Sequence, residues 1–67
     1  MDYRIEQKTD QATGHRRWYL TPEGETEPVA FSTSKQTVME EAITLTGGRG
    51  QIRVRNPKTG RWTEESR

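Results

Sequence analysis

The apolar residues of this chain recur at every second position in several short stretches, which is the pattern of strands with one buried face. The clearest alternation predicts a strand over roughly 3–9 and a second over 15–21, joined by a polar loop that contains a glycine. A short third strand is expected over 29–31, a fourth over 51–55, and a fifth that begins at about 61. The residues between the apolar positions are charged or polar, so the sheet should have one apolar face.

One stretch follows the period of a helix instead. Its apolar residues recur at spacings of three and four and form one stripe: Val38, Met39, Ala42, Ile43 and Leu45. The stripe predicts an amphipathic helix over 34–46. Ser32, Thr33 and Ser34 are three candidate N-caps at its start, and Thr33 with Gln36 has the spacing of a capping box. Gly47 is expected to end the helix in the left-handed conformation.

The order of these elements is βββαββ, which predicts an α+β fold: an antiparallel sheet with one amphipathic helix packed on one face. We expect a single small domain over 1–67, with an ordered core over about 3–63 and a short C-terminal tail. Because one helix covers one face, the other face should be open to water or a partner. Trp18 and Trp62 are expected in the core, since few aliphatic residues are available to fill it.

The composition indicates that the predicted fold is only marginally stable. The chain of 67 residues holds nine Leu, Ile, Val and Phe residues, so its core must be thin. Its formal net charge of +1 and its regular apolar period favour a marginally stable folded domain over a disordered segment. The chain has no cysteine, which suits a cytoplasmic protein, and no stretch that resembles a signal peptide or a membrane span, so we expect no membrane association.

The charges are separated along the sequence. Residues 47–62 contain five Lys and Arg residues and no acidic residue, while residues 22–46 contain five acidic residues and one basic residue. This separation predicts a basic hairpin built from the last two strands. We also expect the acidic side chains to gather on the helix side and the basic ones on the open face of the sheet.

The basic hairpin is the strongest candidate for a functional site. Arg53 and Arg55 share one strand face by alternation, and Arg61 joins them if Trp62 points inward. Guanidinium groups on a β-ribbon can contact the phosphates of DNA or RNA, and an aromatic ring can stack on a base. The predicted nucleic-acid-binding residues are Arg17, Tyr19, Arg49, Arg53, Arg55, Lys58 and Arg61.

Two other interpretations of these arginines stay open. One is that they bind an anionic partner other than nucleic acid, and the other is that they bind no partner. Charged side chains on exposed strands prevent edge-to-edge pairing, so the arginines can serve solubility alone. The protein would then be a protein-protein interaction or accessory module, such as a homodimer formed through the open face or an edge strand. The isoelectric point near 8.2 lies below the value above about 9 that is typical of nucleic-acid-binding domains.

The sequence contains few residues suited to catalysis. His15 is the only histidine, and it lies beside two arginines in a predicted hairpin. Glu40 and Glu41, like Glu64 and Glu65, are neighbours whose side chains point in different directions, so neither pair forms a facing acid and base. We therefore expect no catalytic residue, no metal site and no cofactor, and interpret the protein as a non-enzymatic binding module.

About two-thirds of the chain shows one order of elements and marker residues. A strand with a tryptophan is followed by a short strand, a helix that begins near a threonine, a glycine, an apolar strand and a turn glycine. The residues that carry this order are Trp18, Phe31, Thr33, Ala42, residues 50–54 (Gly-Gln-Ile-Arg-Val) and residues 59–62 (Thr-Gly-Arg-Trp). In this layout the chain resembles the short bacterial and archaeal proteins of domain-of-unknown-function family 2188. Its first strands and helix resemble, more weakly, the YegP-like small domain.

The chain departs from that family pattern at Thr37, where alanine is usual, and at 15–17, where a tight Gly-Trp turn is usual. The resemblance implies a compact fold of sheet and helix, and it implies no activity.

Overall fold

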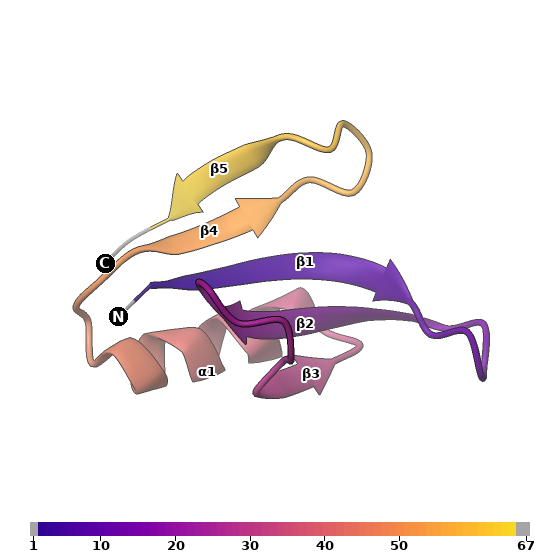
Figure 1. Cartoon of the computed structure of the whole chain (residues 1–67), viewed down its shortest axis with the longest axis horizontal. Coiled ribbons are helices and arrows are strands. Elements are labelled where there is room, and N and C mark those ends of the chain that lie inside the picture. The colour runs from indigo at the N-terminus through magenta and orange to yellow at the C-terminus, as the bar shows by residue number, and fades with distance from the viewer. Residues whose placement is uncertain (1, 66–67) are drawn as a thin grey trace.

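The computed structural model describes residues 2–65, which form one five-stranded sheet and one helix (Figure 1). The elements in chain order are β1 (Tyr3–Thr9), β2 (Arg16–Pro22), β3 (Ala30–Ser32), α1 (Lys35–Thr46), β4 (Ile52–Arg55) and β5 (Trp62–Glu65). The strands lie in the spatial order β3-β2-β1-β4-β5, and α1 packs on one face against β1, β2 and β3. The α+β class and the βββαββ order predicted from the sequence are confirmed.

The sheet is mixed, which corrects the prediction of an antiparallel sheet. The pairs β1–β2, β2–β3 and β4–β5 are antiparallel, but the central pair β1–β4 is parallel, with Tyr3 opposite Ile52 and Ile5 opposite Val54. The reason lies in α1, which carries the chain from β3 across one face of the sheet to the far side of β1. Such a crossover returns the chain in its original direction, and a helix is the usual way to make it.

The core lies between α1 and the centre of the sheet. Its buried apolar residues are Tyr3, Ile5, Leu20, Val38, Ala42, Ile52 and Val54. Each occupies a position that the strand or helix period assigns to the inside. Trp18 is half-buried and packs against this cluster. Two residues predicted to point inward do not: Leu45 is 46% exposed on α1, and Trp62 is 40% exposed on β5.

The two ends of α1 are stabilised by local hydrogen bonds. Ser34, one of the three candidates, caps the start in place of the Thr33 and Gln36 capping box, and its Oγ accepts a hydrogen bond from the Thr37 backbone N–H at 3.5 Å. The other end is as predicted: Gly47 takes a φ of 63°, and its N–H donates to the carbonyl four residues back at 3.0 Å. This left-handed glycine turns the chain out of the helix.

The last strand is longer than predicted. Glu64 and Glu65 belong to β5, opposite Arg53 and Ile52, whereas the sequence assigned them to a frayed tail. The rest of that predicted tail, residues 66–67, lies outside the described residues. Among residues 2–65, no helix has the length and apolar character needed to cross a membrane.

Candidate nucleic-acid interface

The face of the sheet that α1 leaves uncovered, the open face, presents every second side chain of each strand. Ile5, Leu20 and Val54 are buried in the core on the helix side, so their neighbours along the strands point to the open face. By this register the open face carries Arg4, Glu6, Lys8, Arg17, Tyr19, Thr21, Phe31, Arg53, Arg55, Trp62 and Glu64. Four of the predicted site residues therefore lie on one face: Arg17, Tyr19, Arg53 and Arg55.

Trp62 also lies on the open face, so the prediction that it points inward is wrong. It pairs with Arg55 across β4 and β5, and the guanidinium carbon of Arg53 lies 5.4 Å from the centre of its ring. Strand alternation then takes Arg61 away from the face that Arg53 and Arg55 share. The cause is the loop 56–61, which fixes where β5 begins and thereby which of its side chains point inward.

Arg53 is tied into the protein more firmly than Lys8, Arg17 and Arg55 of the open face. Its Nη2 atom donates to both oxygens of the Glu23 carboxylate, each at 3.1 Å, while its guanidinium stacks on Trp62. The other ion pairs of this face are single contacts: Lys8 with Glu6 at 3.3 Å, Arg17 with Asp10 at 3.5 Å and Arg55 with Glu6 at 3.8 Å. Exposed pairs of this kind contribute about 0–1 kcal/mol, so a phosphate competes for these cations more easily than for Arg53.

Carboxylates form part of the open face, which corrects the expectation that they gather on the helix side. Glu6 is only 9% exposed at the centre of the sheet, and Glu64 stands opposite Arg53. The two signs of charge are instead separated along the strands, from one end of the sheet to the other.

The two hairpin turns lie at the same end of the sheet (Figure 1). This turn end comprises residues 8–17 and 55–61, and it carries six Lys and Arg residues against one Asp. The opposite end carries six acidic residues against three Arg residues, in the ranges 2–4, 22–29, 48–53 and 64–65. The basic end follows from the parallel pairing of β1 with β4, because that pairing places both turns on the same side.

Three cations of the turn end are exposed and have no carboxylate within ion-pair distance in the described part of the chain: Arg16, Lys58 and Arg61. Arg16 and Lys8 line a shallow depression with Pro57, so the second turn lies against the first hairpin. Lys58 and Arg61 thus belong to the candidate site through this end, not through the face of Arg53. Arg49, predicted with them, lies at the opposite end in the loop between α1 and β4.

Sequence reasoning missed four residues of this region: Lys8, Arg16, Phe31 and Trp62. The two cations flank the first turn, and only the long-range pairing of β1 with β4 brings them beside the second. Phe31 is exposed on β3, and its ring centroid lies 6.0 Å from that of Tyr19. A signal for Phe31 was present in the sequence, since the small residues on either side of it can point inward.

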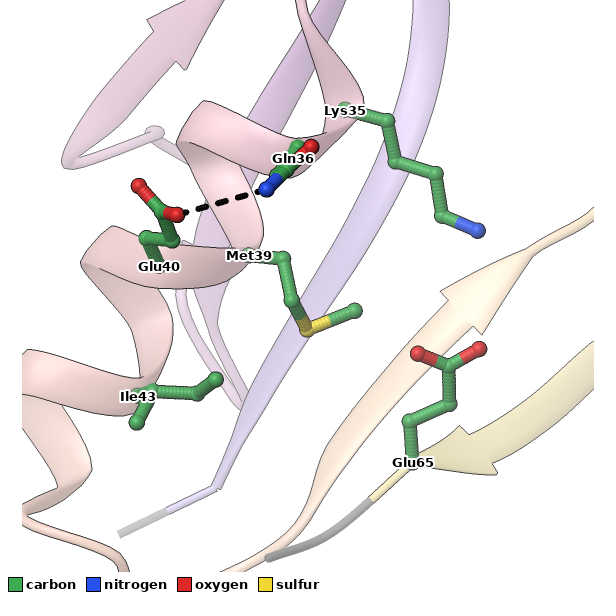
Figure 2. A pocket seen from close by; sticks show the side chains of 6 residues that line it. All are labelled: Lys35, Gln36, Met39, Glu40, Ile43 and Glu65. Atoms are coloured by element: carbon green, nitrogen blue, oxygen red, sulfur yellow. Dashed lines mark hydrogen bonds between the residues drawn. The ribbon is translucent and has the colours of Figure 1, made fainter.

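A groove runs between α1 and β5 on the helix side of the sheet (Figure 2). It is lined by Lys35, Gln36, Met39, Glu40, Ile43 and Glu65. Figure 2 shows the Met39 side chain extending from α1 toward β5, where Glu65 forms the opposite rim. Two carboxylates against one ammonium group make this surface unfavourable for a phosphate, in contrast to the turn end.

The groups considered for catalysis are dispersed. His15 is exposed in the first turn, and Glu40 and Glu41 are exposed on α1. Within residues 2–65, no three or more His, Asp or Glu side chains are placed to hold a metal ion.

No family model, curated protein or solved structure matches this chain. The resemblance to family 2188 and to the YegP-like domain therefore stays a prediction.

Proposed function

We propose that the protein is a non-enzymatic module that binds nucleic acid at its turn end. One observation carries the proposal: two adjacent hairpin turns bring six Lys and Arg residues together with a single Asp. Clustered, exposed cations are the electrostatic footprint of proteins that bind the phosphate backbone.

The cations of the turn end fall into two groups. The first group has no ion pair within residues 2–65, so each of its members can neutralise a phosphate without giving one up: Arg16, Lys58 and Arg61. The second group must first release a carboxylate, so each contributes less: Lys8, Arg17 and Arg55. Arg53 stays with Glu23, and Arg49 lies at the acidic end, so neither is part of the proposed contact.

The acidic end supports the proposal in a second way. A molecule with opposite charges at its two ends is oriented by the field of a polyanion, with its basic end forward. The turn end therefore approaches the phosphate backbone of the nucleic acid first, while the end that contains Glu25 and Glu27 points away from it. Phosphate contacts alone do not distinguish DNA from RNA, so the proposal covers both.

Fluorescence anisotropy of labelled DNA and RNA, titrated with the protein at about 50 and 200 mM salt, tests the proposal. Neutralisation of about four phosphates on a single strand gives a log–log slope of roughly −3. Affinity should therefore fall about fiftyfold between the two salt concentrations.

A pair of double variants locates the contact. Lys58→Glu with Arg61→Glu reverses two charges in the second turn, where neither side chain is buried, and should abolish most of the binding. Lys35→Glu with Arg49→Glu makes the same change in net charge outside the turn end, on α1 and in the loop that follows it, and should retain most of the binding. No binding by the wild-type protein at about 50 mM salt, or equal loss in the two double variants, would contradict the proposal.

A further inference from the structure

One row of side chains crosses the whole open face, with one residue from each strand. In order across the sheet it consists of Phe31, Tyr19, Glu6, Arg55 and Trp62. Aromatic rings occupy both edges of the row, and the ion pair of Glu6 with Arg55 lies between them. Neighbouring strands are about 4.8 Å apart, so the two edges are separated by roughly 19 Å.

The aromatic residues of this row are exposed although the core is short of apolar side chains. Phe31 is 59% exposed, more than Trp62, and the half-buried Tyr19 lies beside it. A thin domain gains stability by burying such rings. Phe31 and Tyr19 form a pair at one edge and Trp62 lies alone at the other, so each edge offers exposed ring surface next to a cation.

A guanidinium holds each edge ring in place. The Arg17 guanidinium carbon lies 5.5 Å from the centre of the Phe31 ring, and that of Arg53 lies 5.4 Å from the centre of the Trp62 ring. Arg53 is itself fixed by Glu23. Trp62 is thus oriented before a ligand arrives, which reduces the ordering cost of binding.

The chemistry of this face fits a chain of bases joined by phosphates. Flat aromatic rings stack on the faces of bases, and neighbouring arginines attract the phosphates between them. Lys8, Arg17 and Arg55 supply cations beside the rings, and the face continues into the turn end. A duplex cannot use the rings, because the faces of its bases are already stacked on one another.

We infer that the open face selects single-stranded nucleic acid, with bases stacked on Phe31 and Tyr19 at one edge and on Trp62 at the other. This inference rests on the proposed function, which supplies the phosphate contacts at the turn end. The bound strand crosses the β-strands along the aromatic row. Four-stranded sheets that bind RNA in this manner stack about two or three bases, which agrees with rings at two edges.

Two leucine variants test the stacking. Phe31→Leu and Trp62→Leu each keep apolar bulk and remove the aromatic face. Anisotropy is measured with a labelled oligothymidine of about ten nucleotides and with the duplex that it forms with its complement. Each variant should weaken binding of the single strand roughly 5- to 150-fold, the effect of losing about one stacked base, and leave duplex affinity unchanged.

Leu45→Ala is the matched control, because it removes an exposed apolar side chain from α1, and it should change neither affinity. Quenching of tryptophan fluorescence by the single strand should disappear in Trp62→Leu. Equal wild-type affinity for strand and duplex, or unchanged strand affinity in both leucine variants, overturns this inference and leaves the turn-end proposal standing. Absence of binding to both probes at about 50 mM salt overturns the proposed function and this inference with it.

Discussion

The two faces of the sheet are built from the same strands but carry different kinds of side chain. Under α1, Ile5 and Leu20 are fully buried in an apolar cluster. On the open face, the residues next to them in sequence are Glu6 and Tyr19, which belong to a row of charged and aromatic side chains. Strand alternation places these two sets of residues a single position apart in the chain and on opposite sides of the sheet.

This difference shows how a chain with a thin core can present a binding surface. The buried apolar residues lie on the helix side, while the open face keeps Phe31 and Trp62 exposed. Substitutions on the helix side should therefore change the free energy of unfolding, and conservative substitutions on the open face should change binding.

The largest effect is expected from Leu20→Ala, which removes a fully buried side chain opposite Ile5. Such a cavity costs about 2–5 kcal/mol, and a domain of this size has a total stability of only about 3–10 kcal/mol. The midpoint of urea unfolding, followed by circular dichroism, should therefore fall by a large part of its wild-type value. Leu45→Ala, the same change at an exposed site, should cost less than about 0.5 kcal/mol.

Gly47→Ala should have the next largest effect, because Gly47 ends α1 at a φ of 63°. A Cβ atom at this position meets no neighbour within 4 Å, so the cost is that of the left-handed backbone alone, about 1–2 kcal/mol. Gly47→Asn should cost less, since asparagine tolerates this conformation. Equal unfolding free energies for the two variants would contradict the role assigned to the cap.

On the open face, Glu6→Gln removes the carboxylate that pairs with both Lys8 and Arg55. The variant should bind the single strand about two- to fivefold more tightly. Each ion pair stabilises the unbound protein by up to about 1 kcal/mol, and this free energy no longer has to be given up when a phosphate binds. Anisotropy measures the gain. Glu41→Gln makes the same change in charge on α1, and an equal gain there would show that only net charge matters.

The smallest effect is expected at the start of α1. Ser34→Ala removes the cap and should cost about 0.5–1 kcal/mol, at the low end for caps because the hydrogen bond to Thr37 is 3.5 Å long. Thr33→Ala should leave the melting temperature unchanged. If Thr33→Ala destabilised the protein more than Ser34→Ala did, the result would favour the capping box of Thr33 and Gln36 predicted from the sequence. Neither variant should alter binding of nucleic acid, since both lie on the helix side.

Much of the fold could be predicted because it depends on short-range patterns. The alternation of Tyr3 and Ile5 with charged neighbours sets the faces of β1, and the helical stripe around Val38 and Ala42 sets the buried side of α1. Gly47 ends the helix for a local reason as well. These features need no knowledge of which distant segment lies beside them.

The candidate site could be predicted only in part, because its arrangement depends on distant partners. Arg53 and its partner Glu23 are 30 residues apart, and nothing in either stretch identifies the other. The parallel pairing of β1 with β4, which creates the basic turn end, is equally non-local. Trp62 depends on both kinds of information. Alternation shows that its neighbours point to the opposite face, but a shift of one residue in the start of β5 would move Trp62 itself to the other face.

The separation of folding and binding between the two faces is tested most directly by an NMR titration of the backbone amides with the oligothymidine strand at low salt. We predict that the amide shifts concentrate at Tyr19, Phe31 and Trp62 and in the turns 10–15 and 56–61, with little change along α1. Shifts concentrated along α1 and its groove with β5 would contradict this prediction, because they would place the ligand on the face that stabilises the fold.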